Sequence, residues 1–120
     1  MIESFFQRAL ENLKAAELLF ENGLYNASAN RAYYSAFHAA IVVLFRNGLK
    51  PDIDHRKVLS LFSSELINKR KIFSSKFKED IYEMQKNRIL ADYGTGISKT
   101  KSATQLKFTK EFIKIILKDI

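Results

Sequence analysis

The stretch ANRAYYSAFHAAIVVL, residues 29–44, decides the fold that we expect from this chain. It lies within a predicted helix over residues 26–47, and its apolar side chains cover most of the helix circumference. A helix that is apolar on most sides is usually a central one, and the many alanines allow other helices to approach closely. The polar exceptions Arg31, Tyr34, Ser35 and His38 recur at steps of three, four and seven, which predicts one polar stripe.

Four more amphipathic helices are predicted around this central one. Their apolar residues recur at three- and four-residue steps over residues 4–22, 55–69, 74–93 and 98–120. The connections between them are short, which is typical of a bundle with mostly antiparallel neighbours. We therefore expect an all-α, antiparallel bundle of about five helices, forming a single domain over residues 1–120.

Local signals predict where some of these helices begin and end. Ser4 with Gln7 has the spacing of a capping box, and Asp54 is a suitable N-cap for the third helix. Asn22-Gly23 predicts the end of the first helix, because glycine adopts the left-handed conformation that stops a helix.

The composition restricts the class of protein. The chain of 120 residues is 47% hydrophobic and 28% charged, which is ordinary for one globular domain. It has no cysteine, which excludes disulfides, thiolate metal sites and a cysteine nucleophile. No run of about 18 apolar residues is present, and the start lacks the basic segment of a signal peptide. We expect no membrane association and a cytoplasmic location.

The net charge of +7 is unevenly distributed. Residues 1–45 carry three basic and four acidic residues, whereas residues 46–120 carry seventeen basic and nine acidic ones. A basic half can attract RNA, another nucleic acid or an acidic protein partner. Lysine-rich helix faces are also common where they are merely solvated, so charge alone does not decide between these interpretations.

The segment NRILADYG, residues 87–94, holds the first candidate site. Arg88 and Asp92 are four residues apart near a helix end, so they should share a face. They could form a structural ion pair capped by an aromatic ring. Alternatively, Arg88 binds a phosphate, Asp92 orients it or handles a proton, and Tyr93 supplies a hydroxyl or a stacking ring.

A second group of candidates comes from other helices. His55, at a predicted helix start, could act as the general base on a ribose 2′-hydroxyl in RNA cleavage, or it could be a surface histidine. If the second and fourth helices are neighbours, Arg31, Tyr34 and Ser35 could form a polar, ligand-binding pocket with Arg88, or a structural hydrogen-bond network between helices. The chain has no glycine-rich phosphate loop and no metal-ligand spacing, so we expect neither a cofactor nor a metal.

The segment AYYSAFHAA, residues 32–40, resembles the A-Y-Y-A-x-F-x-A-A signature of HEPN domains. Together with His55 after the loop and the R-x-x-x-D-Y pattern of residues 88–93, it is similar to the small stand-alone HEPN proteins of the UPF0332 type. The resemblance covers about residues 4–118. It implies a bundle of four or five helices that forms a homodimer.

The resemblance also implies a function. Many HEPN proteins are metal-independent RNases that act as toxins, with an R-x(4–6)-H motif from each subunit meeting in one cleft. Stand-alone members often pair with a minimal nucleotidyltransferase, an antitoxin that can modify a tyrosine near the motif. Carried over, Arg88 corresponds to the motif arginine and Tyr93 to the modified tyrosine.

The sequence departs from this motif at one position. No histidine follows Arg88, and Asp92 occupies the neighbourhood where the RNase motif has its histidine. Three hypotheses remain: a toxin-type RNase that uses Arg88 with Asp92 or His55, a non-catalytic module that binds a nucleotide or a partner, and a structural adaptor.

Overall fold

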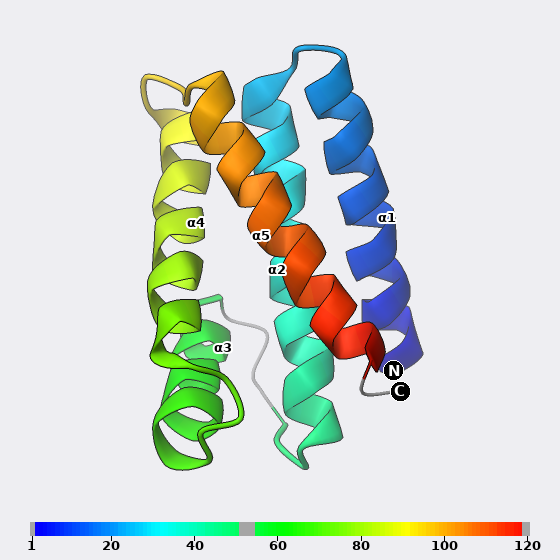
Figure 1. The fold of residues 1–120 in the computed structure, drawn as a ribbon, viewed down its shortest axis with the longest axis vertical. Helices are drawn as coiled ribbons and strands as arrows, with labels where there is room; N and C mark the ends of the chain where they lie inside the picture. The colour runs from blue at the N-terminus through cyan, green and yellow to red at the C-terminus, as the bar shows by residue number, and fades with distance from the viewer. Residues whose placement is uncertain (1, 51–54, 119–120) are drawn as a thin grey trace.

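Helix α2 (Tyr25–Arg46) is the element around which the other helices pack, as its sequence predicts. Thirteen of its 22 residues are buried, and Ala32, Ala39 and Leu44 are completely inaccessible. Figure 1 shows α1 (Ile2–Glu21) and α4 (Ser75–Tyr93) on opposite sides of α2, with α5 (Lys99–Lys118) crossing it diagonally.

This computed structural model describes residues 2–50 and 55–118, with the backbone alone at residues 55, 56, 117 and 118. The described part holds five α-helices, so the prediction of an all-α bundle of about five helices is confirmed. None of the described helices is long and apolar enough to cross a membrane.

The third predicted helix changes its geometry partway along. It begins as α3 (His55–Leu61) and continues as the π-helix η1 (Phe62–Lys69). Phe62, Leu66 and Ile67 are all buried, at intervals of four and one residues. The wider turn of a π-helix, with its i→i+5 hydrogen bonds, allows such neighbours to face the core together.

Side-chain donors fix how α1 and α5 run against α2. The hydroxyls of Ser28 and Ser35 donate to main-chain carbonyls of α1, at Ala16 and Ala9 respectively. From α5, three side chains donate to main-chain carbonyls of α2: Ser102 to Tyr25, Gln105 to Ala29, and Thr109 to Ala32. Residue numbers rise along α2 while those of their partners on α1 fall, so α1 and α2 are antiparallel. Residue numbers rise together along α5 and α2, so these two helices run in the same direction (Figure 1).

The helix ends agree with the sequence in one place and differ in another. Gly23 has a φ of 77°, and the N–H groups of Gly23 and Leu24 donate to the carbonyls of Phe20 and Leu19, as a glycine stop requires. The capping box predicted for Ser4 is wrong, because α1 already includes Ile2 and Ser4 therefore lies inside the helix. The predicted N-cap, Asp54, lies outside the described residues.

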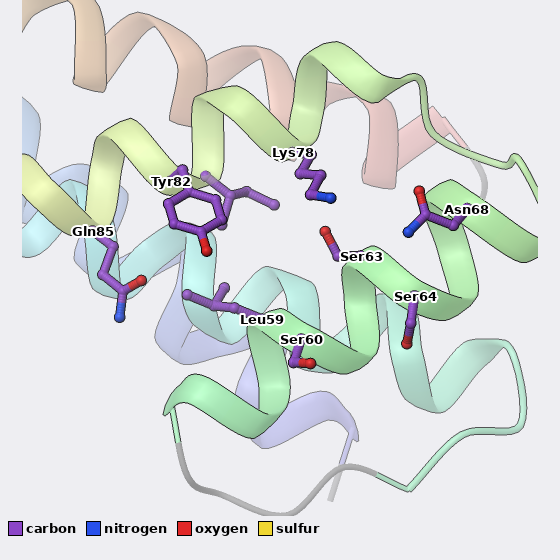
Figure 2. A pocket seen from close by; sticks show the side chains of 9 residues that line it. Leu59, Ser60, Ser63, Ser64, Asn68, Lys78, Tyr82 and Gln85 are labelled. Atoms are coloured by element: carbon purple, nitrogen blue, oxygen red, sulfur yellow. The ribbon is translucent and has the colours of Figure 1, made fainter.

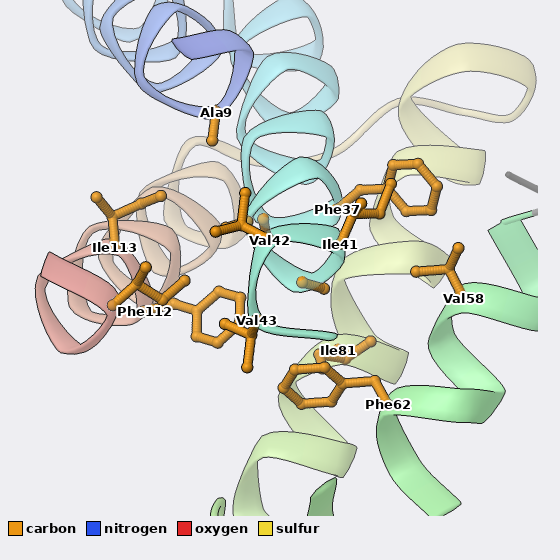
Figure 3. Close-up of a cluster of buried hydrophobic side chains, with 14 of the residues drawn as sticks. Ala9, Phe37, Ile41, Val42, Val43, Val58, Phe62, Ile81, Phe112 and Ile113 are labelled. Carbon is orange, nitrogen blue, oxygen red and sulfur yellow. The ribbon is translucent and has the colours of Figure 1, made fainter. Parts of the chain in front are cut away.

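Phenylalanine rings join η1, α4 and α5, and Figure 3 shows two of them, Phe62 and Phe112, in the buried core. Phe112 of α5 is completely buried, and its ring centroid lies 5.8 Å from that of Phe62 and 5.7 Å from that of Phe73. Phe77 of α4 adds a further contact to Phe112 at 5.9 Å. These contacts hold α4 in place beside α2, and α4 carries the candidate site at its other end.

Candidate functional site

Arg88 and Asp92 meet in the last turns of α4, as their spacing predicts. The Arg88 Nη1 lies 3.5 Å from the Asp92 Oδ2. The two side chains are only 15% and 22% exposed, although the pair lies near the end of a surface helix. Neighbouring side chains on α2 explain this burial.

Two tyrosine rings of α2 lie under the Arg88 guanidinium. The Arg88 Cζ is 5.0 Å from the ring centroid of Tyr33 and 5.9 Å from that of Tyr34. Burial raises the pKa of Tyr33 to about 12, and the nearby positive charge of Arg88 opposes only part of this rise. Tyr33 therefore stays neutral and presents a ring face to the cation.

Asn30 connects the acidic end of the pair to α2. Its Nδ2 donates to both carboxylate oxygens of Asp92, at 3.1 and 2.9 Å. Its Oδ1 in turn accepts hydrogen bonds from the Arg31 guanidinium, at 2.9 Å from Nε. The Arg31 Nη1 continues to the Oδ1 of Asn12 on α1, at 3.1 Å. A polar network thus spans α4, α2 and α1.

The residues of the polar stripe predicted along α2 divide into two groups. Arg31 and Tyr34 lie beside Arg88 and Asp92, whereas Ser35 and His38 face α1. The Arg31 Cζ lies 5.2 Å from the ring centroid of Tyr34, so that two arginines, Arg31 and Arg88, contact this ring. Ser35 instead donates to the carbonyl of Ala9 at 2.6 Å. The ring Nδ1 of His38 lies 3.4 Å from the Nδ2 of Asn12, on the α1 side.

One predicted site residue is turned to solvent, and the side chain of another lies outside the described residues. Tyr93 follows Asp92 directly but is 81% exposed. The backbone of His55 begins α3, and its side chain lies outside the described residues. Their functional roles remain predictions.

Sequence reasoning missed the residue at the centre of the network. Asn30 bridges Asp92 and Arg31 because α2 and α4 are neighbours, a fact that spacing along one helix cannot supply. The only available signal was its position four residues before Tyr34, on the same face of the predicted helix.

The network borders an open hollow of about 530 Å³. Four of its lining side chains are polar, and three are apolar: Asn26, Asn30, Arg31 and Asp92, with Leu19, Ala27 and Ala91. Arg31 at its wall, with Arg88 next to Asp92, supplies positive charge suited to an anion such as a phosphate. Among the described residues, no group of three or more His, Asp or Glu side chains is placed to hold a metal ion.

The chain is thus an all-helical bundle with a charged hydrogen-bond network where α2 and α4 meet. The chain belongs to the HEPN domain family, whose family model matches residues 2–120. It is 34% identical over 128 residues to "Putative toxin MJ0605" of Methanocaldococcus jannaschii, which covers 99% of this chain and 90% of the relative. It is 31% identical over 113 residues to "UPF0332 protein PH1297" of Pyrococcus horikoshii, covering 94% and 69%. "Putative toxin MJ0142" of the former organism is 29% identical over 112 residues, covering 93% and 75%.

Proposed function

We propose that this chain is the toxin-type HEPN component of a two-component module and that it cleaves RNA without a metal ion. The observation that carries the proposal is the Arg88 guanidinium, which contacts the Tyr33 ring and Asp92, a residue that lines an open hollow. The toxin names of two relatives and the basic net charge of +7 favour the same function.

In the proposed reaction, a base takes the proton of a ribose 2′-hydroxyl, and the 2′-oxygen forms a bond to the adjacent phosphorus. The P–O5′ bond breaks, which leaves a 2′,3′-cyclic phosphate, and the departing 5′-oxygen takes a proton from water. The N–H groups of Arg88 stabilise the negative charge that builds up on the phosphate oxygens. Asp92 and His55 are the candidate bases.

The test is cleavage of a mixed-sequence RNA by the purified protein in the presence of a chelator. Arg88→Ala should lower the rate by about 100-fold or more, the usual cost of losing one charge-stabilising group. Lys86→Ala is the matched control, because Lys86 is an exposed cation on the same helix. Intact RNA after incubation with folded wild-type protein, or equal rates for wild type and Arg88→Ala, would refute the RNase proposal.

If cleavage is found, two further variants assign the base. His55→Ala and Asp92→Asn each remove one candidate, and the variant that lacks the base should lose most of its rate at neutral pH. The dependence of the cleavage rate on pH, measured for the variant that stays active, then tests the assignment of the base independently. Imidazole and carboxyl groups have well-separated ordinary pKa values.

A second candidate function is a non-catalytic module that binds a nucleotide or a partner through Arg31, Tyr34, Arg88 and Asp92. It is favoured by the full engagement of Asp92, which accepts two hydrogen bonds from Asn30 and contacts Arg88. Calorimetric titration with a nucleoside monophosphate tests it. Binding that Arg88→Ala abolishes, with no RNA cleavage by the wild type, would favour this function.

The proposed partners are a second copy of the chain and a minimal nucleotidyltransferase that acts as antitoxin. Light scattering on the purified protein tests the homodimer, and co-purification after joint expression tests the antitoxin. Tyr93, at 81% exposure, is open to a modifying enzyme. Mass spectrometry of the co-expressed protein should show a nucleotide adduct that Tyr93→Phe abolishes, and an unmodified wild-type chain would contradict this assignment.

A further inference from the structure

A second hollow, of about 490 Å³, lies between α4 and the α3–η1 segment (Figure 2). Its volume is within the range of small-molecule binding sites. It is separate from the hollow beside Asp92, and the two share no lining residue. The second hollow is lined by Leu59, Ser60, Ser63, Ser64, Asn68, Lys78, Ile81, Tyr82 and Gln85. We call it the α3–α4 groove.

The two ends of the α3–α4 groove differ in chemistry. Figure 2 shows the Lys78 ammonium, the Ser63 hydroxyl and the Asn68 amide facing one another at one end. Lys78 is exposed and forms no ion pair with any described residue. A cation with a hydroxyl and an amide is a donor set suited to a phosphate.

The other end is suited to a flat, partly apolar group. The Tyr82 ring lies there above Leu59, and the Gln85 amide stands beside it (Figure 2). Tyr82 is 69% exposed, so its ring is accessible to a ligand. A nucleobase can stack on such a ring, and an amide can donate and accept at its edge.

The π-helical geometry of η1 shapes the floor of the groove. Ser63, Ser64 and Asn68 of η1 line it together with Leu59 and Ser60 of α3. π-helical turns occur frequently at functional sites.

The groove leads along α4 towards Arg88. Its residues Leu59 and Ile81 also line a small apolar crevice that reaches Tyr33, the ring beneath the Arg88 guanidinium. Tyr82 and Arg88 are six residues apart on one helix, so about 9 Å separate them along its axis. The groove and Arg88 therefore lie less than two helical turns apart along α4, on different faces of the helix.

The geometry points to the α3–α4 groove as a binding site for one nucleotide of single-stranded RNA, with the phosphate at Lys78 and the base on Tyr82. This inference rests on the proposed RNase function, since the bound strand is the substrate of that reaction. The same nucleotide chemistry could come from a free mononucleotide, so the experiment includes both sources.

The experiment measures the affinity of the wild-type protein for a short 2′-O-methyl RNA, which lacks the 2′-hydroxyl needed for cleavage, by fluorescence anisotropy. Tyr82→Ala should weaken binding about 5- to 150-fold, the usual effect of losing one base–aromatic stack, and Tyr82→Phe should retain it. Lys78→Gln should make the slope of log affinity against log salt shallower by about 0.7, and Lys86→Gln should leave it unchanged. Equal affinities for wild type and Tyr82→Ala, or equal slopes for the two lysine variants, would overturn the inference.

A competition with adenosine and uridine monophosphate separates the two sources of nucleotide. Displacement of the RNA only at much higher mononucleotide concentration supports the RNA strand as ligand. A mononucleotide that binds more tightly than the RNA, and loses its affinity in Tyr82→Ala, overturns it in favour of the free nucleotide. Because this assay detects binding without cleavage, an inactive protein that still binds through Tyr82 refutes only the RNase proposal. If the protein cleaves RNA but Tyr82→Ala binds RNA as tightly as the wild type, only the proposed nucleotide site in the groove is refuted.

Discussion

Asp92 is held more strongly by Asn30 than by Arg88, and double-mutant cycles should show this order. The two hydrogen bonds from the Asn30 amide, at 2.9 and 3.1 Å, end on a carboxylate, and hydrogen bonds to charged groups contribute about 1.5–3 kcal/mol to stability. The Arg88 contact is long, at 3.5 Å, and partly open to water. Ion pairs of this kind contribute about 0.2–1 kcal/mol. The predicted coupling energy is therefore larger for Asn30–Asp92.

The assay is urea unfolding of the wild type, of Asn30→Ala, Arg88→Ala and Asp92→Ala, and of the two double variants that contain Asp92→Ala. Each cycle isolates one pairwise energy from the free energies of unfolding. Added salt should weaken the Arg88–Asp92 coupling more than the Asn30–Asp92 coupling, because only the former joins two charges. A coupling energy for Arg88–Asp92 equal to or above that for Asn30–Asp92 would refute this reasoning.

Three more predictions concern the core, a loop and one tyrosine. Phe112→Ala should lower the free energy of unfolding by about 3–5 kcal/mol, because a completely buried ring leaves a cavity; a loss below 1 kcal/mol in urea unfolding would contradict this. Gly23→Ala should cost about 1–2 kcal/mol because its φ is 77°. Gly96→Ala should lower the free energy of unfolding more than Gly23→Ala does. Its φ is also positive, at 87°, and the new Cβ would in addition lie 3.2 Å from the Asn26 side chain; equal losses for the two variants would count against that contact. In an absorbance titration one of the five tyrosines should ionise last, near pH 12, and Tyr33→Phe should remove that step. Since the folded pKa is above the unfolded value of 10, the stability from Tyr33 is complete below pH 10 and is lost as the pH rises to about 12; retention of the last step in Tyr33→Phe would exclude this assignment.

The helices could be predicted from the sequence because their periodicity is local. The apolar repeats define five helical segments, and the alanine-rich stretch identifies α2 as central. The π-helix could not be predicted, because the four-residue spacing of Phe62 and Leu66 also fits an α-helix. The direction of α5 was also missed, because short loops specify which helices are neighbours along the chain but not how α5 crosses α2.

The part of the candidate site that lies on one helix followed directly from the sequence, whereas the approach of Tyr34 to Arg88 was one of two alternatives that the sequence left open. Arg88 and Asp92 were paired correctly because four residues make about one turn. Placing Arg88 on Tyr33 requires knowing that α4 packs against α2, and that contact is tertiary. The α3–α4 groove depends on two segments and on the π-helical turn, so its serines gave no pattern that periodicity analysis could detect.

The hydrogen bonds that join α1, α2 and α5 make mutational tolerance unequal across each interface. Five side chains of α2 and α5, such as Ser35 and Thr109, donate to carbonyls of the main chain. Every residue type carries that acceptor, so a substitution at Ala9 or Ala32 cannot remove it, and only the size of the new side chain matters. A substitution that removes the donor hydroxyl or amide removes the bond outright. During evolution the acceptor positions are free to drift among small residues, whereas the donors must persist or change together with the helix spacing.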